Sequence, residues 1–336
     1  MPKSNKSATL IRASGVRPVL DFALASDIQW QISLALTAQV STGTLTRMAS
    51  EPGKTILDDI VFTRRQTLEK TRLTVPLKSV QQMAEARQDR RDFAAALAAK
   101  ATLPAPLGLR VIAETKRASP SRGMLRQIYR PDEIAVGYAD AGVAAISVLT
   151  EEKFFLGSLQ HLAEVRRAVE VPVLRKDFIL ESYQIYESVA VGADALLLIV
   201  AALPDRDLRS LLVLCEQLRI SALVEVHTIE ELERAVAAGA GIIGVNNRNL
   251  KTLEVTLETS FALRTKIPRG CLTISESGIK TAADLRRIRE AGFDAVLMGE
   301  RLMTEADPGQ ALHRLLSEFR EQPDPFEIGN SEIGIR

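Results

Sequence analysis

A carboxylate and an ammonium group stand two residues apart at the end of one apolar segment. In the stretch VIAETKRASPSRG (111–123), three apolar residues typical of a buried strand come first, and Glu114 and Lys116 follow. Residues i and i+2 of a strand lie on the same face, so the two charges are expected side by side. A protonated lysine can act as a general acid and a carboxylate as a general base. The spacing therefore predicts acid–base chemistry at this strand end.

Polar side chains recur at the ends of further apolar segments. They are Lys176 in VPVLRKD, Glu225 in LVEVH, Asn246 and Arg248 in GVNNR, and Glu276 and Ser277 in SESG. Glu225 stands between two valines, and a lone carboxylate there is costly to bury unless it is paired. We therefore expect one shared site rather than separate structural ion pairs. Asp177, Asn247 and Glu300 are interpreted instead as solvated residues at strand ends.

The elements that position these groups alternate between strand and helix. Eight apolar strand segments are expected at 110–116, 144–150, 171–177, 195–201, 222–227, 242–248, 272–278 and 295–300. Near-continuous apolar runs are typical of parallel strands covered on both faces. Eight such units predict an α/β protein with a (β/α)8 TIM barrel, in which the strand ends converge on one mouth. A doubly wound open sheet is the alternative, but no G-x-G-x-x-G follows the first strand.

Helix ends carry signals of their own. Gly142, Gly192, Gly239 and Gly292 each precede a strand and can take the left-handed conformation that ends a helix. Thr228 with Glu231 predicts a capping box, and Thr281 predicts an N-cap.

Four regions follow from composition and pattern. Residues 1–53, rich in Ser and Thr with few acids, are expected to be a poorly ordered extension, with an organelle transit peptide as the alternative. Residues 54–104 are expected to be an N-terminal helical segment, 105–320 the barrel, and 321–336 a C-terminal tail.

Composition limits the classes of partner. The chain has 336 residues, 46% of them apolar, and a net charge of +1, so neither nucleic acid nor a membrane surface is expected as a partner. The two cysteines and three histidines show no metal-ligand spacing, which predicts no metal site and a reducing, cytoplasmic location. No apolar run approaches the roughly 20 residues of a membrane span.

A phosphate site is expected at the ends of the last two strands. Gly278 and Gly299 would let main-chain N–H groups approach an anion there, and Ser119 with Ser121 in the first loop would add hydroxyl donors. The nearby cations would then hold an anionic, phosphorylated small molecule despite the neutral overall charge.

Together these segments carry a family resemblance. The motifs are IAETKRASPSRG, SVLTEEKFFLGSL, PVLRKDFI, GADALLLIVAAL, LVEVHT, GVNNRNLKTLEV, SESGI and VLMGERLM. In this order they closely resemble the indole-3-glycerol phosphate synthase family, a group of carboxy-lyases of tryptophan biosynthesis. The resemblance implies closure of the indole ring of 1-(2-carboxyphenylamino)-1-deoxyribulose 5-phosphate with loss of CO2 and water. It also implies no metal or organic cofactor, and a helical segment before the barrel that caps its mouth.

The resemblance also implies roles for individual residues. Lys176 matches the general acid of ring closure, Glu225 a proton-transfer group, and Glu114 and Lys116 the pair on the first strand. Substrate positioning is implied for Asn246, Arg248, Glu276 and Ser277, and phosphate contacts for Ser119, Gly278 and Gly299. Whether Lys116 or Lys176 is the principal acid stays open. Ala118 and Glu300 depart from the pattern, because some members carry Lys and Ser there.

Alternatives remain at this stage. A sugar-phosphate isomerase would use an Asp pair or Cys with Asp, and a catalytically idle barrel would have lost its charged strand ends. The apolar lining for an aromatic ring is expected from Phe93, Leu149, Phe178 and Leu197. The oligomeric state is left open, with a monomer as the working expectation.

Overall fold

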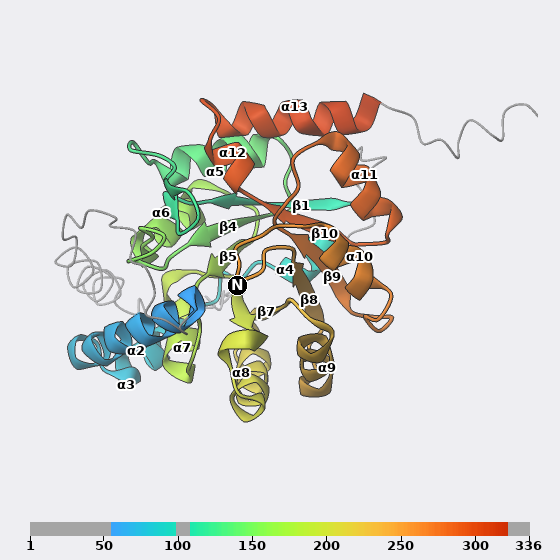
Figure 1. Ribbon diagram of the computed structural model, residues 1–336. Coiled ribbons are helices and arrows are strands. Elements are labelled where there is room, and N and C mark those ends of the chain that lie inside the picture. Colours follow the sequence, from blue (N-terminus) through green and yellow to red (C-terminus); the bar gives the residue numbers. More distant parts are fainter. Residues whose placement is uncertain (1–54, 99–107, 322–336) are drawn as a thin grey trace, which may run out of the picture.

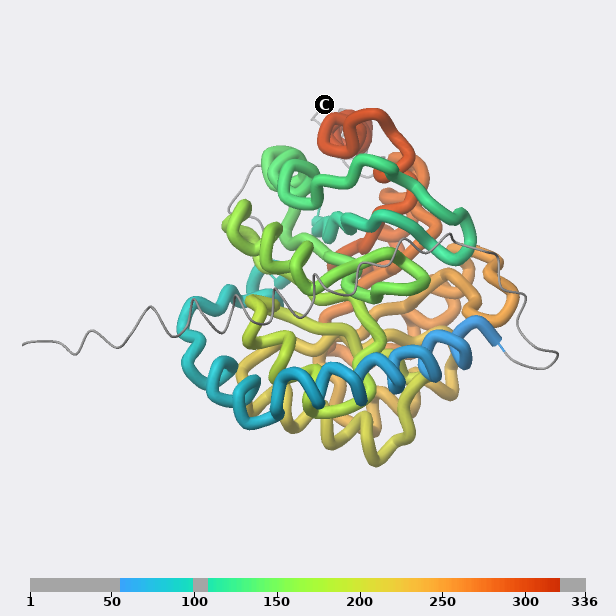
Figure 2. Tube along the Cα trace, turned by 90° about the vertical axis from the view of Figure 1, so that its left-hand side faces the viewer, coloured from blue at the N-terminus to red at the C-terminus, as the bar shows by residue number. Residues whose placement is uncertain are grey.

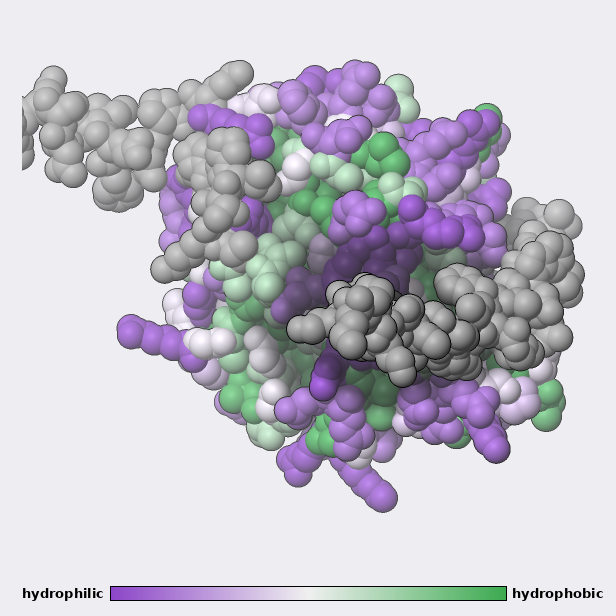
Figure 3. All heavy atoms as spheres, turned by 180° about the vertical axis from the view of Figure 1, so that it is seen from behind, coloured by the Kyte–Doolittle hydropathy of each residue, from purple (hydrophilic) through white to green (hydrophobic). Residues whose placement is uncertain are grey.

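The computed structural model describes residues 55–98 and 108–321. The predicted N-terminal extension at 1–53 lies outside the described residues, and so does the predicted tail from residue 322 onward. No helix within the described ranges is long and apolar enough to cross a membrane. Figure 3 shows hydrophilic side chains around much of the outline of one face and a mixture of apolar and hydrophilic side chains toward its middle.

Eight parallel strands close into a barrel, in the order β1-β10-β9-β8-β7-β6-β5-β4, with β4 pairing back to β1. These strands are β1 (Arg110–Thr115), β4 (Ala145–Leu149), β5 (Val173–Lys176), β6 (Ala195–Ile199), β7 (Ser221–Val226), β8 (Ile242–Asn246), β9 (Leu272–Glu276) and β10 (Ala295–Met298). Each lies within or one residue from a predicted segment. The predicted (β/α)8 TIM barrel is confirmed.

Helices surround the barrel on its outer face (Figure 1). They are α5 (Pro131–Asp140), α6 (Leu159–Ala168), α7 (Ser182–Val191), α8 (Asp205–Gln217), α9 (Ile229–Ala238), α10 (Glu258–Arg264), α11 (Ala282–Glu290), α12 (Glu300–Met303) and α13 (Pro308–Glu321), with a 3-10 turn η1 (Val200–Ala202) after β6. The predicted Thr281 cap forms a full capping box with Asp284. At Thr228 only half of the predicted box forms, because the Glu231 carboxylate accepts from the N–H of His227 instead.

Alternation along each strand divides the apolar side chains between two cores. On β6, Ala195 and Leu197 pack in a cluster inside the barrel, whereas Leu196 and Leu198 pack in a second cluster under the helices. Successive side chains of a strand point to opposite faces, so each strand contributes to both clusters. This explains why the strand sequences are apolar almost throughout.

The helices that precede β1 contribute to both ends of the barrel. α2 (Ile56–Thr74) brings Ile56 and Ile60 to the cavity at the mouth, as predicted for a capping segment. α3 (Leu77–Ala86) packs against α7, beside the barrel (Figure 2).

α4 (Phe93–Ala98) lies at the opposite end. Phe93 and Leu97 are buried in the inner cluster. The N–H of Arg91, two residues earlier, donates to Asp194 Oδ1 at 3.0 Å, immediately before β6 begins. The segment is thus fixed where the strands start, and the prediction that Phe93 lines the substrate cavity is wrong.

Replacing Phe93 with alanine should lower the free energy of unfolding by about 3–5 kcal/mol, because a fully buried aromatic ring would leave a cavity under the barrel. Urea denaturation measures the change. The matched control is Phe62→Ala on α2, where the ring is 64% exposed and the change should stay within about 0.5 kcal/mol. Equal effects of the two substitutions would contradict the burial of α4 at the end of the barrel where the strands start.

Candidate active site

A cavity of about 560 Å³ opens at the carboxyl ends of the strands. Its size is that of a typical small-molecule site. All of the site residues predicted from sequence line it: Glu114, Lys116, Ser119, Lys176, Glu225, Asn246, Arg248, Glu276, Ser277, Gly278 and Gly299. The structure therefore brings together groups that span more than half of the chain, and their individual roles stay predictions.

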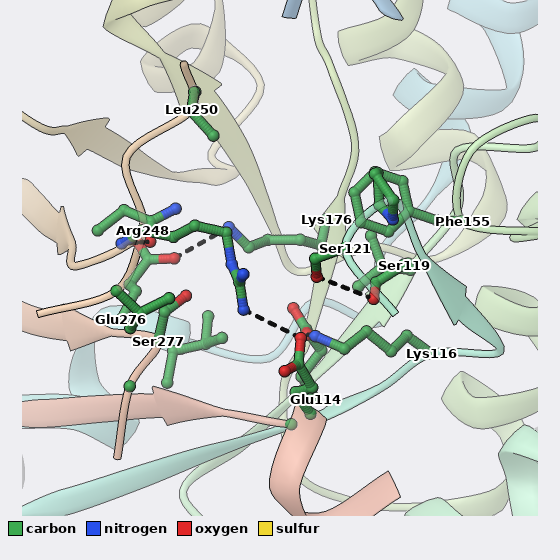
Figure 4. Close-up of a pocket in the computed structure, with 18 of the residues that line it drawn as sticks. Glu114, Lys116, Ser119, Ser121, Phe155, Lys176, Arg248, Leu250, Glu276 and Ser277 are labelled. Carbon is green, nitrogen blue, oxygen red and sulfur yellow. Dashed lines mark hydrogen bonds and ion pairs between the residues drawn. The ribbon is translucent and has the colours of Figure 1, made fainter. Parts of the chain in front are cut away.

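Lys176 at the end of β5 lies between two carboxylates. Its Nζ is 2.7 Å from Glu225 Oε2 on β7 and 2.9 Å from Glu276 Oε2 on β9 (Figure 4). The two glutamates are 2% and 1% exposed, so the cluster is almost removed from water. A buried carboxylate needs a partner of opposite charge, and here one ammonium serves two.

This sharing separates the acidities of the three groups. Burial alone would lower the pKa of Lys176, but attraction from Glu225, Glu276 and Glu114 outweighs it and raises the pKa. Burial, together with repulsion from Glu225, raises the pKa of Glu276 to about 7 despite the opposing attraction of Lys176. The lysine is therefore held as an ammonium, and one carboxylate of the pair takes up a proton near neutral pH.

Glu114 and Lys116 form the second ion pair of the mouth. Their Oε1 and Nζ atoms are 2.5 Å apart, as the i, i+2 spacing on β1 predicted (Figure 4). Gly299 makes room for this pair, because a Cβ there would stand 2.7 Å from Glu114 Cβ. Close packing against Glu114 thus explains the glycine at this position, independently of any contact of Gly299 with phosphate.

Gly244 in the middle of β8 is a site residue that sequence reasoning missed. A side chain there would overlap the Glu276 carboxylate, which reaches across the barrel interior toward Lys176. The available signal was a glycine inside an apolar strand, which often marks close approach of another group.

The rim formed by the loops after β1, β9 and β10 carries the features expected of an anion site. β2 (Ala118–Ser119) and β3 (Gly123–Met124) pair as a short hairpin that fixes the first loop and Ser119 within it. Ser277 and Gly278, directly after β9, have φ values of +68° and +83°. This left-handed turn brings both residues to the cavity wall, where main-chain N–H groups can meet an anion.

Glu300 occupies this rim and is paired, so its interpretation as a solvated residue is wrong. Its carboxylate oxygens lie 3.0 Å from Arg122 Nε and 3.0 Å from Arg248 Nη2. The carboxylate therefore neutralises the two guanidinium groups that line the cavity at this end.

Asp177 is also not solvated. Although it follows Lys176 directly, its carboxylate faces outward and contacts Arg64 of α2 and Arg175 of β5, each at 2.9 Å. Thr150 Oγ1 donates to the same oxygen at 2.6 Å. The two arginines outweigh burial and hold the pKa of Asp177 below its usual value. This buried network attaches α2 to the strand that carries Lys176.

Asn247 is the third of the residues interpreted as solvated, and it is 1% exposed. Its amide nitrogen donates to the carbonyl oxygens of Glu276 and Ser277, both at 3.0 Å, and to Ser275 Oγ at 3.0 Å. Its amide oxygen accepts from the N–H of Ser260 at 3.1 Å. Asn247 thus holds the turn after β9 in place through hydrogen bonds to its main chain.

Apolar side chains complete the cavity. Leu149, Phe178 and Leu197, three of the four predicted, line it together with Phe155 and Leu250. Within residues 55–98 and 108–321, no group of three or more His, Cys, Asp or Glu side chains could hold a metal ion. The site therefore combines an apolar wall, a polar rim and two lysine–glutamate clusters.

Comparison with known proteins identifies a family. The model of the family described as indole-3-glycerol phosphate synthase matches residues 57–315. The indole-3-glycerol phosphate synthase of Chloroherpeton thalassium is 50% identical over 250 residues, which cover 74% of this chain and 95% of that protein. The one from a Polaromonas species is 46% identical over 260 residues, which cover 77% of this chain and 97% of that protein.

Solved structures agree on architecture. A 3-hexulose-6-phosphate synthase, 16% identical, aligns with a TM-score of 0.50 over 62% of this chain and 99% of that chain. At this identity the likeness shows the barrel fold alone.

The pKa of the Glu276 carboxyl should fall when Glu225 is replaced by glutamine. Repulsion from Glu225 raises that pKa, and the substitution leaves Lys176 to stabilise a single carboxylate. Titration of the side-chain carboxyl by 13C NMR should show a pKa of about 7 in the unmodified protein and a lower value in the variant. Glu258→Gln on the outer surface is the control and should change nothing; an unchanged Glu276 pKa in Glu225→Gln would refute the sharing of Lys176.

Proposed function

The chain belongs to the indole-3-glycerol phosphate synthase family, and on that premise we propose that its barrel mouth closes the indole ring of 1-(2-carboxyphenylamino)-1-deoxyribulose 5-phosphate. The product is indole-3-glycerol phosphate, and CO2 and water are released. The observation that carries the proposal is Lys176, held as an ammonium between Glu225 and Glu276 at an apolar cavity wall.

Ring closure requires the ring carbon that bears the carboxylate to attack the ketone carbon of the sugar chain. We assign Lys176 as the general acid that donates a proton to the ketone oxygen. Its low exposure of 12% favours this role, since a charge developing on that oxygen is stabilised most strongly where water is excluded. Holding the two carbons together within one folded molecule supplies a further part of the acceleration.

The pair on β1 takes the carboxylate of the substrate. Lys116 is 12% exposed and reaches the cavity, so it can hold that anion until it leaves as CO2. Glu225 accepts and returns protons during the dehydration that follows. Asn246, Glu276 and Ser277 position the substrate from the far side of the mouth.

The phosphate lies at the rim formed by Ser119, Gly278 and Gly299, with Arg248 beside it. Arg122 offers a cation close to the position where some relatives carry a lysine and this chain carries Ala118. Both arginines are paired with Glu300. A dianionic phosphate competes with that carboxylate for the same guanidinium groups.

Three proposals concern the protein beyond its site. The catalytic unit comprises residues 54–104 and 105–320, which agrees with the family match at 57–315. A monomeric state and a cytoplasmic location stay predictions from sequence. A transit peptide at 1–53 stays the alternative to that location.

Replacing Lys176 with methionine should reduce kcat by roughly 10²–10⁴-fold, the usual contribution of a general acid. Formation of the indole product, followed by its fluorescence, measures the rate. Lys116→Met tests the alternative acid; its expected effect is mainly on KM, because it holds a substrate anion. Lys251→Met, in an exposed loop, is the control. A larger loss of kcat in Lys116→Met would reassign the principal acid.

Replacing Glu300 with glutamine should lower KM by roughly threefold to tenfold, because the substitution removes a negative charge from the phosphate end and frees two arginines. Steady-state kinetics and competition by inorganic phosphate measure the effect, with Glu305→Gln beyond the rim as control. An increase in KM would mean that Glu300 organises the arginines for the phosphate rather than competing with it.

A further inference from the structure

Each turnover consumes one proton. In ring closure a bond forms between the ring carbon and the ketone carbon, and the ketone oxygen takes up a proton. The bond to the carboxylate then breaks, CO2 leaves, and its electron pair restores the aromatic ring. In dehydration the hydroxyl group takes up a second proton and leaves as water, while the methylene carbon next to nitrogen loses one. Two protons enter and one returns, so one must come from solvent.

The groups that are proposed to transfer these protons have little access to solvent. Lys176 and Glu225 are 12% and 2% exposed, and what exposure they have faces the cavity that the substrate fills. Once substrate is bound, solvent cannot reach them through the mouth. A path through the protein would let the proton arrive while the substrate is bound.

His227 lies behind Glu225, two residues along the chain from it. Its Nε2 is 3.4 Å from Glu225 Oε1, and its Nδ1 is 3.0 Å from Glu231 Oε2 at the start of α9. The Nε2 atom is buried and has no hydrogen-bond partner among the described residues, although Glu225 is within ion-pair distance.

The row formed by Glu231, His227 and Glu225 runs from the surface to the site. The Glu231 side chain is 17% exposed, the His227 side chain 10% and the Glu225 side chain 2%. Glu225 lines the cavity, whereas the other two do not. Exposure thus falls step by step toward Lys176.

Charges around the ring favour the imidazolium form. Glu225 of β7, Glu231 of α9 and Glu276 of β9 face His227, and Lys176 of β5 contacts Glu225 from the other side. Burial alone would lower the pKa of His227, but the hydrogen bond to Glu231 and the attraction of the three carboxylates raise it. His227 therefore holds its proton more firmly than a free histidine does.

We propose that His227, held by Glu231, is a positioning residue that delivers the consumed proton to Glu225 and through it to Lys176. When Lys176 gives its proton to the substrate, Glu225 loses its neighbouring cation and becomes a better base. The Nε2–H bond then breaks and the proton moves to Glu225 Oε1. The neutral ring that remains keeps its proton on Nδ1, hydrogen-bonded to Glu231, until Nε2 takes up the next proton from solvent. The inference rests on the proposed role of Glu225.

His227→Gln tests this delivery, because a glutamine amide can place an N–H near the position of Nε2 but cannot transfer a proton. We expect kcat to fall about tenfold, less than the roughly 10²–10⁴-fold of a direct acid–base group, with KM unchanged. In the unmodified protein kcat should decline as pH rises through the pKa of His227. That decline should vanish in the variant, the solvent deuterium isotope effect should grow, and added imidazole should restore part of kcat.

Glu231→Gln provides a second test, independent of whether His227→Gln folds. Glu231 raises the pKa of His227, so its loss should move the decline of kcat to lower pH. His313→Gln, on the exposed face of α13, is the control and should leave kcat and its pH profile unchanged.

Two results overturn the inference: an unchanged kcat in His227→Gln, or a loss that is equal at all pH values and not relieved by imidazole. Glu225→Gln separates this failure from that of the proposed function. If Glu225→Gln retains full turnover, the role of Glu225 itself is wrong. If Glu225→Gln is inactive while His227→Gln resembles the unmodified protein, only the delivery path is refuted.

Discussion

The shared ion pair of one buried ammonium and two buried carboxylates is the constraint on which the site depends. Isolated, any of Lys176, Glu225 and Glu276 would be too costly to remove from water in its charged form. Together they form a cluster in which the lysine stays protonated and the pKa of the Glu276 carboxyl is raised to about 7. The same low-polarity surroundings that make the cluster costly also make a proton transfer from it effective.

Several neighbouring residues hold this cluster in place. Gly244 leaves the space that the Glu276 carboxylate occupies, and Asn247 supports the turn that follows Glu276. On the other side of β5, Asp177 contacts Arg64 of α2 and Arg175. Adjacent residues at one strand end thus have different partners: Lys176 lines the cavity, and the Asp177 carboxylate contacts the two arginines. The helix that contributes to the mouth is consequently joined to the strand that carries Lys176.

Apolar and charged side chains lie in separate regions of the mouth. These regions match a molecule that has an aromatic ring, a carboxylate and a phosphate. An apolar wall with Leu149, Phe178 and Leu197 suits an aromatic ring, and the β1 pair lies where a carboxylate can be held. The adjoining rim has a left-handed turn and two arginines balanced by Glu300. A protein with almost no net charge can therefore bind a strongly anionic substrate, because the cations are concentrated where the anions lie.

The sequence by itself determined the barrel and the polar residues at its mouth. Apolar strands at regular spacing, glycines at helix ends and polar residues at strand ends are local features, and a closed parallel barrel brings all strand ends to one mouth. Strand alternation also fixed Glu114 beside Lys116. The tertiary structure alone decided what no local pattern contains: that Lys176 is shared by two carboxylates, that Asp177, Asn247 and Glu300 are paired, and that α4 and Phe93 lie at the far end. These depend on distances between residues far apart in the chain, and a buried charge takes its partner and its pKa from those distances.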